Sequence, residues 1–171
     1  MIKLIGALCI FLACGFCGME ISKRMAERTK QLRLFIAALE SLEAEIVYGH
    51  SLLHDASRRI ASQLEGPVSN IFRFFSDKLV REETTAKNAW KESLDKYWKK
   101  SALKTAEYEI LLQFGETLGR HDLEQQQKHI RLAITHLERE EKESYRRQTT
   151  YGKIANNFGF LSGLLVILLL I

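Results

Sequence analysis

Charged residues are absent from both ends of this chain and crowded into its middle. No charged side chain occurs from Leu4 to Met19 or from Phe158 to Ile171, whereas all 21 acidic residues lie between these two runs. A helix of about 20 mainly apolar residues crosses the hydrocarbon core of a bilayer, and both runs approach that length once their border residues are added. The pattern predicts transmembrane helices at 1–21 and 154–171.

Basic residues flank both apolar runs on the side of the middle region. Lys23, Arg24 and Arg28 follow the first run, and Arg146, Arg147 and Lys153 precede the second. Because positively charged flanks resist translocation, we expect a cytoplasmic middle region with both termini outside. Two alternatives stay open: the first run can be a cleaved signal peptide, and either run can enter the bilayer without spanning it.

The middle region has the apolar periodicity of amphipathic α-helices. Breaks near Gly49, Gly66, Thr85, Ser101 and Gly119 divide it into six helices, with Gly49 in the left-handed conformation, and with Ser51 and Asp122 as caps. We therefore expect an all-α fold, a compact six-helix bundle at 22–137 flanked by the N- and C-terminal transmembrane helices. Candidate core residues include Leu32, Phe35, Leu39, Leu42, Ile46, Ile60, Ile71, Phe72, Phe75, Trp90, Leu94, Ala106, Leu111, Phe114, Ile130 and Leu137.

Two segments near the C-terminus carry further predictions. Apolar positions vanish from Glu138 to Thr150. A helix that is polar on every side does not join a core, so 138–153 is predicted to be a juxtamembrane helical stalk. In the last apolar run, Gly159 and Gly163 have the GxxxG spacing that allows another membrane helix to approach closely.

No residue pattern indicates catalysis. The chain lacks HExxH, GxxxxGK[ST], GxGxxG and GxSxG. His50 and His54 are four residues apart, but they straddle a predicted helix break and no carboxylate accompanies both, so a metal site is not expected. No basic stripe alternates with aromatic residues as in nucleic-acid-binding proteins. We expect no enzyme activity, cofactor, metal or nucleic-acid partner.

Two sequence blocks, LEAEIVYGH (Leu42 to His50) and FGETLGRHD (Phe114 to Asp122), resemble the stage III sporulation protein AB family of endospore-forming bacteria. The resemblance covers essentially the whole chain, including the terminal GFLSGLLVILLLI. One departure is Ser51-Leu52-Leu53, because the family usually has a sequence such as Thr-Pro-Leu after the YGH triplet.

The resemblance implies a role in protein assembly. Such proteins belong to the channel between mother cell and forespore, in the mother-cell membrane around the forespore. Their helical domain is similar to the F-like cytoplasmic domain of the type II secretion platform protein. Implied partners are the membrane, the stage III sporulation ATPase AA and the AC-to-AH channel components; a homo-oligomer stays open. A membrane-anchored signalling or sensor module without an ATPase partner is the alternative.

A platform of this kind works through contact surfaces. We expect its partner interface at the helix ends that face away from the membrane, with candidates Glu43, Glu45, Gly49, His50, Gly119 and Asp122. The competing interpretation is that the glycines and Asp122 only terminate helices and that the glutamates are ordinary solvated positions.

Overall fold

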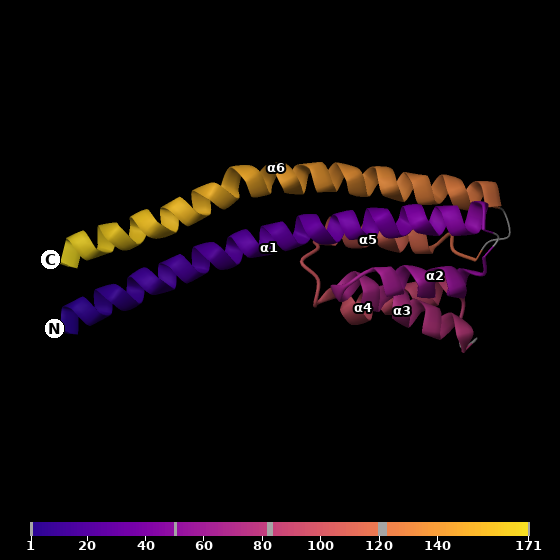
Figure 1. Cartoon of the computed structure of the whole chain (residues 1–171), viewed down its shortest axis with the longest axis horizontal. Coiled ribbons are helices and arrows are strands. Elements are labelled where there is room, and N and C mark those ends of the chain that lie inside the picture. Colours follow the sequence, from indigo (N-terminus) through magenta and orange to yellow (C-terminus); the bar gives the residue numbers. More distant parts are fainter. Residues whose placement is uncertain (1, 50, 82–83, 120–122, 171) are drawn as a thin grey trace. The chain divides into compact units, whose positions relative to one another are not determined.

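The computed structural model describes the backbone at 2–49, 51–81, 84–119 and 123–170, and the side chains at 19–49, 51–81, 84–119 and 123–150. These residues contain six α-helices and no strand (Figure 1). The helices are α1 (Ile2–Val47), α2 (Leu53–Gln63), α3 (Gly66–Val80), α4 (Ala86–Trp98), α5 (Thr105–Gly115) and α6 (Leu123–Leu170). The predicted all-α class and the count of six helices are confirmed.

The first and last helices are much longer than the other four. α1 has 46 residues and α6 has 48, so each continues from the middle region into a terminal apolar run without a break. Among the residues whose side chains the structure describes, no helix combines the length and the apolar character needed to cross a bilayer. The predicted membrane segments at 1–21 and 154–171 lie almost entirely outside the residues whose side chains are described.

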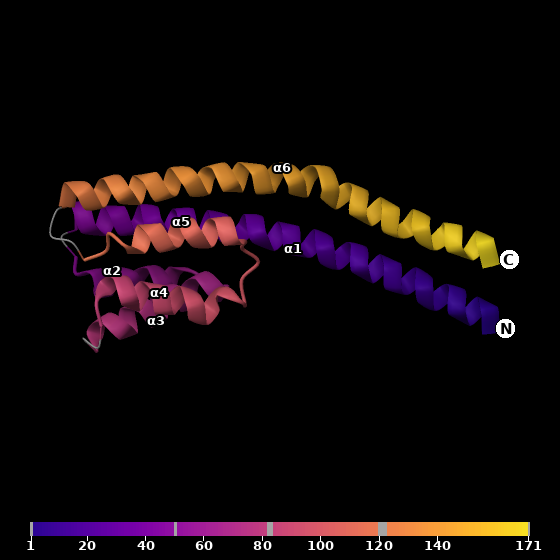
Figure 2. The ribbon, with the colours of Figure 1, turned by 180° about the vertical axis from the view of Figure 1, so that it is seen from behind.

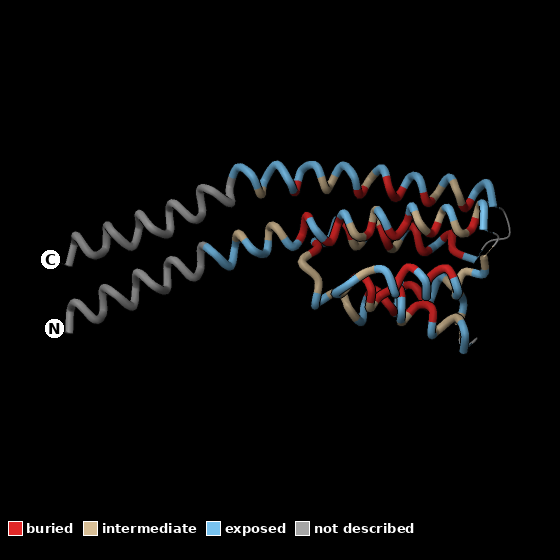
Figure 3. The backbone as a smooth tube through the Cα atoms, viewed as in Figure 1, coloured by how far each residue is buried: buried red, intermediate tan, exposed pale blue. Residues whose placement is uncertain are grey.

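The chain divides into two units, which are described separately. One unit comprises Lys30–Glu141 and is called the helical bundle below; the other comprises Met1–Thr29 and Lys142–Ile171 and is called the helical pair. Within the bundle, α1 and α6 run side by side, and α2, α3 and α4 form a second group of helices (Figures 1 and 2). Buried residues follow the inward faces of both groups (Figure 3).

Trp90 of α4 lies at the centre of the bundle core. Its side chain is fully buried, and its ring makes edge-to-face contacts with Phe72, Phe75 and Phe114 at centroid distances of 5.3, 5.2 and 5.4 Å. The indole Nε1–H donates to the backbone oxygen of Leu111 at 2.7 Å, which satisfies the polar atom of an otherwise apolar side chain. Trp90 thereby joins α4 to α3 and α5.

Most predicted core residues are buried, but α5 differs from the prediction. The helix begins at Thr105, because Ser101 forms a turn with Trp98. Glu107 then occupies the third helical position, where its carboxylate accepts from the amide of Lys104 at 2.6 Å and the residue is fully buried. Ala106, predicted in the core, is exposed because the helix presents Glu107, Leu111 and Phe114 inward.

The helical pair contains a buried polar contact. The hydroxyls of Thr29 and Ser144 lie 2.9 Å apart, and both residues are almost fully buried. The segment from Glu138 to Thr150 is therefore not exposed on every side, although it has no apolar stripe. Small hydroxyl side chains can pack closely between helices when they hydrogen-bond to each other.

Candidate partner-docking site

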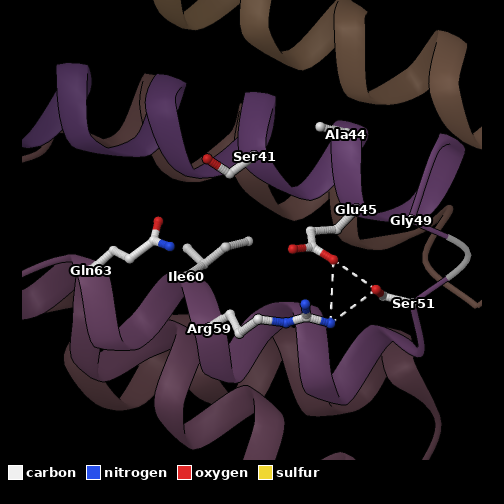
Figure 4. A pocket seen from close by; sticks show the side chains of 8 residues that line it. All are labelled: Ser41, Ala44, Glu45, Gly49, Ser51, Arg59, Ile60 and Gln63. Carbon is white, nitrogen blue, oxygen red and sulfur yellow. Dashed lines mark hydrogen bonds and ion pairs between the residues drawn. The ribbon is translucent and has the colours of Figure 1, made fainter.

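A pocket of about 510 Å³ lies between the last turns of α1, the connection that follows, and the second half of α2 (Figure 4). At its centre, Ser51 Oγ donates to Glu45 Oε2 at 2.6 Å. The guanidinium of Arg59 donates to Ser51 Oγ at 2.9 Å and lies 3.3 Å from the same Glu45 oxygen. Only 26% of the Glu45 side chain is exposed. Glu45 thus joins α1 to α2.

This network explains why the predicted cap at Ser51 is wrong. α2 begins at Leu53, and the residue before it, Leu52, provides no side-chain cap. The Ser51 hydroxyl donates instead to a carboxylate, and hydrogen bonds to charged groups are stronger than those between neutral groups. Ser51 therefore fixes the connection from α1 to α2.

Glu43 is also held within the bundle. Its Oε1 accepts from Arg131 Nε at 2.6 Å and from Gln127 Nε2 at 2.8 Å, and only 15% of its side chain is exposed. Because both donors come from α6, Glu43 fixes the end of α1 against the beginning of α6. A partner protein that used this carboxylate would have to compete with both contacts.

Three exposed apolar side chains lie at the helix ends of this part of the bundle. Tyr48 is 77% exposed and Leu52 is 64% exposed, immediately before and after the break between α1 and α2. Leu123, the first residue of α6, is exposed as well. Large apolar side chains grouped on a surface are typical of contact sites. Tyr48, Leu52 and Leu123 are called the apolar rim below.

The two predicted interface glycines differ in backbone conformation. Gly119 has a φ of +80°, the left-handed region that suits glycine, and it closes the turn after α5. Gly49 is not among the described glycines with positive φ, so the predicted left-handed ending of α1 is wrong there. The Gly49 amide instead donates to Ala44 O at 3.2 Å, and an added Cβ would lie 2.8 Å from Glu45 O.

The remaining predicted site residues lie outside the described parts of the structure. His50 and Asp122 fall in its gaps, and Gly159 and Gly163 belong to the stretch of α6 without described side chains. The structure therefore brings Glu43, Glu45 and Gly49 together near the end of α1 and places Gly119 in the turn after α5. The other four predicted residues lie outside the described side chains.

The described side chains contain no candidate metal site. No group of three or more His, Cys, Asp or Glu residues suited to a metal occurs among them. Every buried side-chain nitrogen and oxygen in the same set has a hydrogen-bond partner. His129 and His136 are half-buried beside Phe114, where they line a cavity of about 20 Å³. That space is close to the volume of one water molecule.

Sequence reasoning missed three residues that organise this end of the molecule. Arg59 and Arg131 hold the two interface glutamates, and Gly115 allows Trp90 to approach α5. The sequence does not indicate the roles of the two arginines, because the glutamate partner of Arg131 is far away in sequence and that of Arg59 lies across a helix break. Gly115 gave a weak one, since a glycine inside an apolar helical pattern indicates a close approach.

Comparisons with known proteins point to a single family. The profile of a family described as stage III sporulation protein AB matches residues 3–171. The stage III sporulation protein AB of Bacillus subtilis (strain 168) is 52% identical over 170 residues, covering 99% of both chains. A solved structure of a stage III sporulation protein AB is 55% identical, with a TM-score of 0.70, and the match covers 72% of this chain and 98% of that one.

Proposed function

The chain belongs to the stage III sporulation protein AB family, and we propose that it is a non-enzymatic membrane platform of the channel between mother cell and forespore. The terminal parts of α1 and α6 cross the mother-cell membrane around the forespore, with the helical bundle in the cytoplasm and both termini outside. The bundle links the stage III sporulation ATPase AA to the AC-to-AH channel components.

The full-length family match carries this proposal, because it extends through both terminal apolar runs. Such runs suit hydrocarbon, and the basic residues beside them favour a cytoplasmic bundle.

The apolar rim is the proposed ATPase contact. Glu43 and Glu45 serve it indirectly, because their hydrogen bonds to α6 and α2 hold the helix ends that present Tyr48, Leu52 and Leu123. Gly49 and Gly119 belong to the connections at the ends of α1 and α5. Exposed aromatic and aliphatic side chains provide contact energy when a partner covers them.

Membrane attachment is tested first. The protein should stay in the membrane pellet after alkaline carbonate extraction of sporulating cells. A cysteine introduced at Lys91 should react with a membrane-impermeant thiol reagent only after permeabilisation, with the unsubstituted chain as the control for its own cysteines. Release by carbonate would refute the membrane-embedded platform, and labelling of intact cells would reverse the orientation.

Recruitment of the ATPase is tested with Tyr48→Ser/Leu52→Ser. Both side chains are largely exposed, so the variant should keep its melting temperature while losing most of the membrane-bound ATPase, by about ten-fold or more. Leu132→Ser, an exposed apolar residue of α6, is the matched control and should recruit normally. The platform role would fail if the ATPase reached the membrane equally well without this protein.

A further inference from the structure

The two units differ in charge. The helical pair carries eight basic and three acidic side chains, whereas the bundle carries 17 basic and 18 acidic ones. Seven of the eight basic residues of the pair lie at 23–28 and 142–153, beside the apolar runs. The excess charge of the chain is thus concentrated where a membrane surface is proposed.

Part of this charge lines a pocket within the helical pair. The pocket has a volume of about 880 Å³ and is lined by Met25, Lys142, Glu143, Arg146, Arg147 and Thr150. Glu143 forms an ion pair with Arg147 on the same face of α6. Lys142 and Arg146 are exposed and stand outside the described ion pairs. Both side chains can therefore bind an anion without breaking a described ion pair.

The lining chemistry suits a phosphate that carries an apolar tail. A guanidinium donates two parallel hydrogen bonds to phosphate oxygens, and a lysine ammonium adds a compact charge. Thr150 supplies a hydroxyl, and Met25 supplies an apolar, adaptable wall. Thr150 precedes the predicted membrane segment at Ile154 by four residues, about 6 Å along a helix. The Thr150 end of the pocket therefore lies at the level of the headgroup layer, whereas the backbones of Arg146 and Lys142 lie about 12 and 18 Å from Ile154, so that their long side chains must reach toward the lipid.

We propose that this pocket binds the headgroup phosphate of an anionic phospholipid in the cytoplasmic leaflet. The proposal rests on the membrane attachment proposed above and adds a ligand to it. Topology alone also requires basic flanking residues, but it requires neither a pocket nor a preference among lipids. Lipid selectivity therefore separates a binding site from a topological signal.

The test uses the full-length chain reconstituted in phosphatidylcholine vesicles with spin-labelled phosphatidylglycerol or spin-labelled phosphatidylcholine. The wild-type protein should prefer the anionic lipid. Each cation near an anionic membrane surface favours association on the order of five-fold, so Lys142→Gln/Arg146→Gln should lower this preference by about five- to 25-fold. The matched control, Arg73→Gln/Lys91→Gln, removes two exposed cations of the bundle and should leave the preference unchanged.

A third variant should increase the preference for the anionic lipid. Glu143→Gln removes the carboxylate that pairs with Arg147, so it should increase the preference for the anionic lipid. The proposed lipid site would be overturned if both lipids associated equally with the wild-type protein, or if the two double variants lost the preference for the anionic lipid to the same extent. Neither result would affect the proposed membrane attachment. A protein that fails to enter vesicles of either lipid would refute the proposed function itself. If millimolar inorganic phosphate alone stabilised the detergent-solubilised protein, the ligand of the pocket would be a soluble anion, and the proposal of a lipid ligand would be overturned.

Discussion

Replacing Gly115 by alanine places a methyl group against the central tryptophan. A Cβ at this position would lie 2.3 Å from Trp90 Cδ1, far inside van der Waals contact. The indole cannot move away easily, because three phenylalanine rings and the hydrogen bond to Leu111 surround it. Overpacking of a core costs about 1–3 kcal/mol, and alanine recovers up to about 1 kcal/mol in a helix. We expect a net loss of about 1–2 kcal/mol.

The assay is thermal unfolding of the full chain, followed by circular dichroism. For a chain of this size the loss corresponds to a fall in Tm of about 2–8 °C. In a Trp90→Ala background the indole is gone, so Gly115→Ala should be neutral or stabilising by up to about 1 kcal/mol. If alanine lowers Tm equally in both backgrounds, the close approach to Trp90 is not the reason for glycine at this position.

Three further predictions concern polar contacts. Glu43→Gln should lower stability by about 1–3 kcal/mol because it weakens charge-assisted hydrogen bonds to α6, whereas Glu40→Gln at an exposed position should not shift Tm. The hydrogen bond from Tyr108 to a carboxylate of α4, together with burial and the nearby charge, raises the tyrosine pKa to about 12. The ordinary pKa of a tyrosine is near 10, so the stabilisation from the neutral Tyr108 hydroxyl is complete below pH 10 and is lost as the pH rises to 12. Absorbance at 295 nm should show the raised pKa, and unfolding measured at each pH should show the loss of stability. Thr29→Val should cost about 1–3 kcal/mol because it removes the hydrogen-bond partner of the buried Ser144 hydroxyl. Ser144→Ala should cost less, because the Thr29 hydroxyl keeps its hydrogen bond to the Met25 backbone oxygen at 3.2 Å. The double variant should lose less than the sum of the single variants, and strict additivity of the Tm shifts would argue against the pairing.

The apolar stripes of the sequence predict most of the bundle. Leu32, Phe35 and Leu39 recur at helical spacing and are all buried, and Pro67 lies in the first turn of α3, as expected for a residue without an amide hydrogen. The prediction failed in α5, where Ala106 was placed in the core and Glu107 is buried instead. Ala106 and Glu107 are neighbours on the helix, and an apolar pattern favours the alanine as the buried one of the two. Glu107 is buried instead because its carboxylate accepts from the Lys104 amide at 2.6 Å, a hydrogen bond that periodicity does not show.

The candidate site was predictable only in part. The sequence marked Glu43, Glu45 and the glycine breaks as the end of the bundle, and the structure places the first two at the end of α1. It could not show that both carboxylates are already engaged by Arg131 and Arg59, because those contacts join residues 88 and 14 positions apart. The exposed rim of Tyr48, Leu52 and Leu123 likewise depends on which side chains the bundle leaves uncovered.

By itself the sequence determined the helical class, the helix breaks and the uncharged ends, because these follow from local propensity and from the spacing of apolar residues. Tertiary structure alone decided the partners of the polar residues and the place where glycine is required. Thr29 meets Ser144 and Trp90 meets Gly115 only after distant helices have packed, and hydrogen bonding and steric fit depend on distances that no local pattern contains.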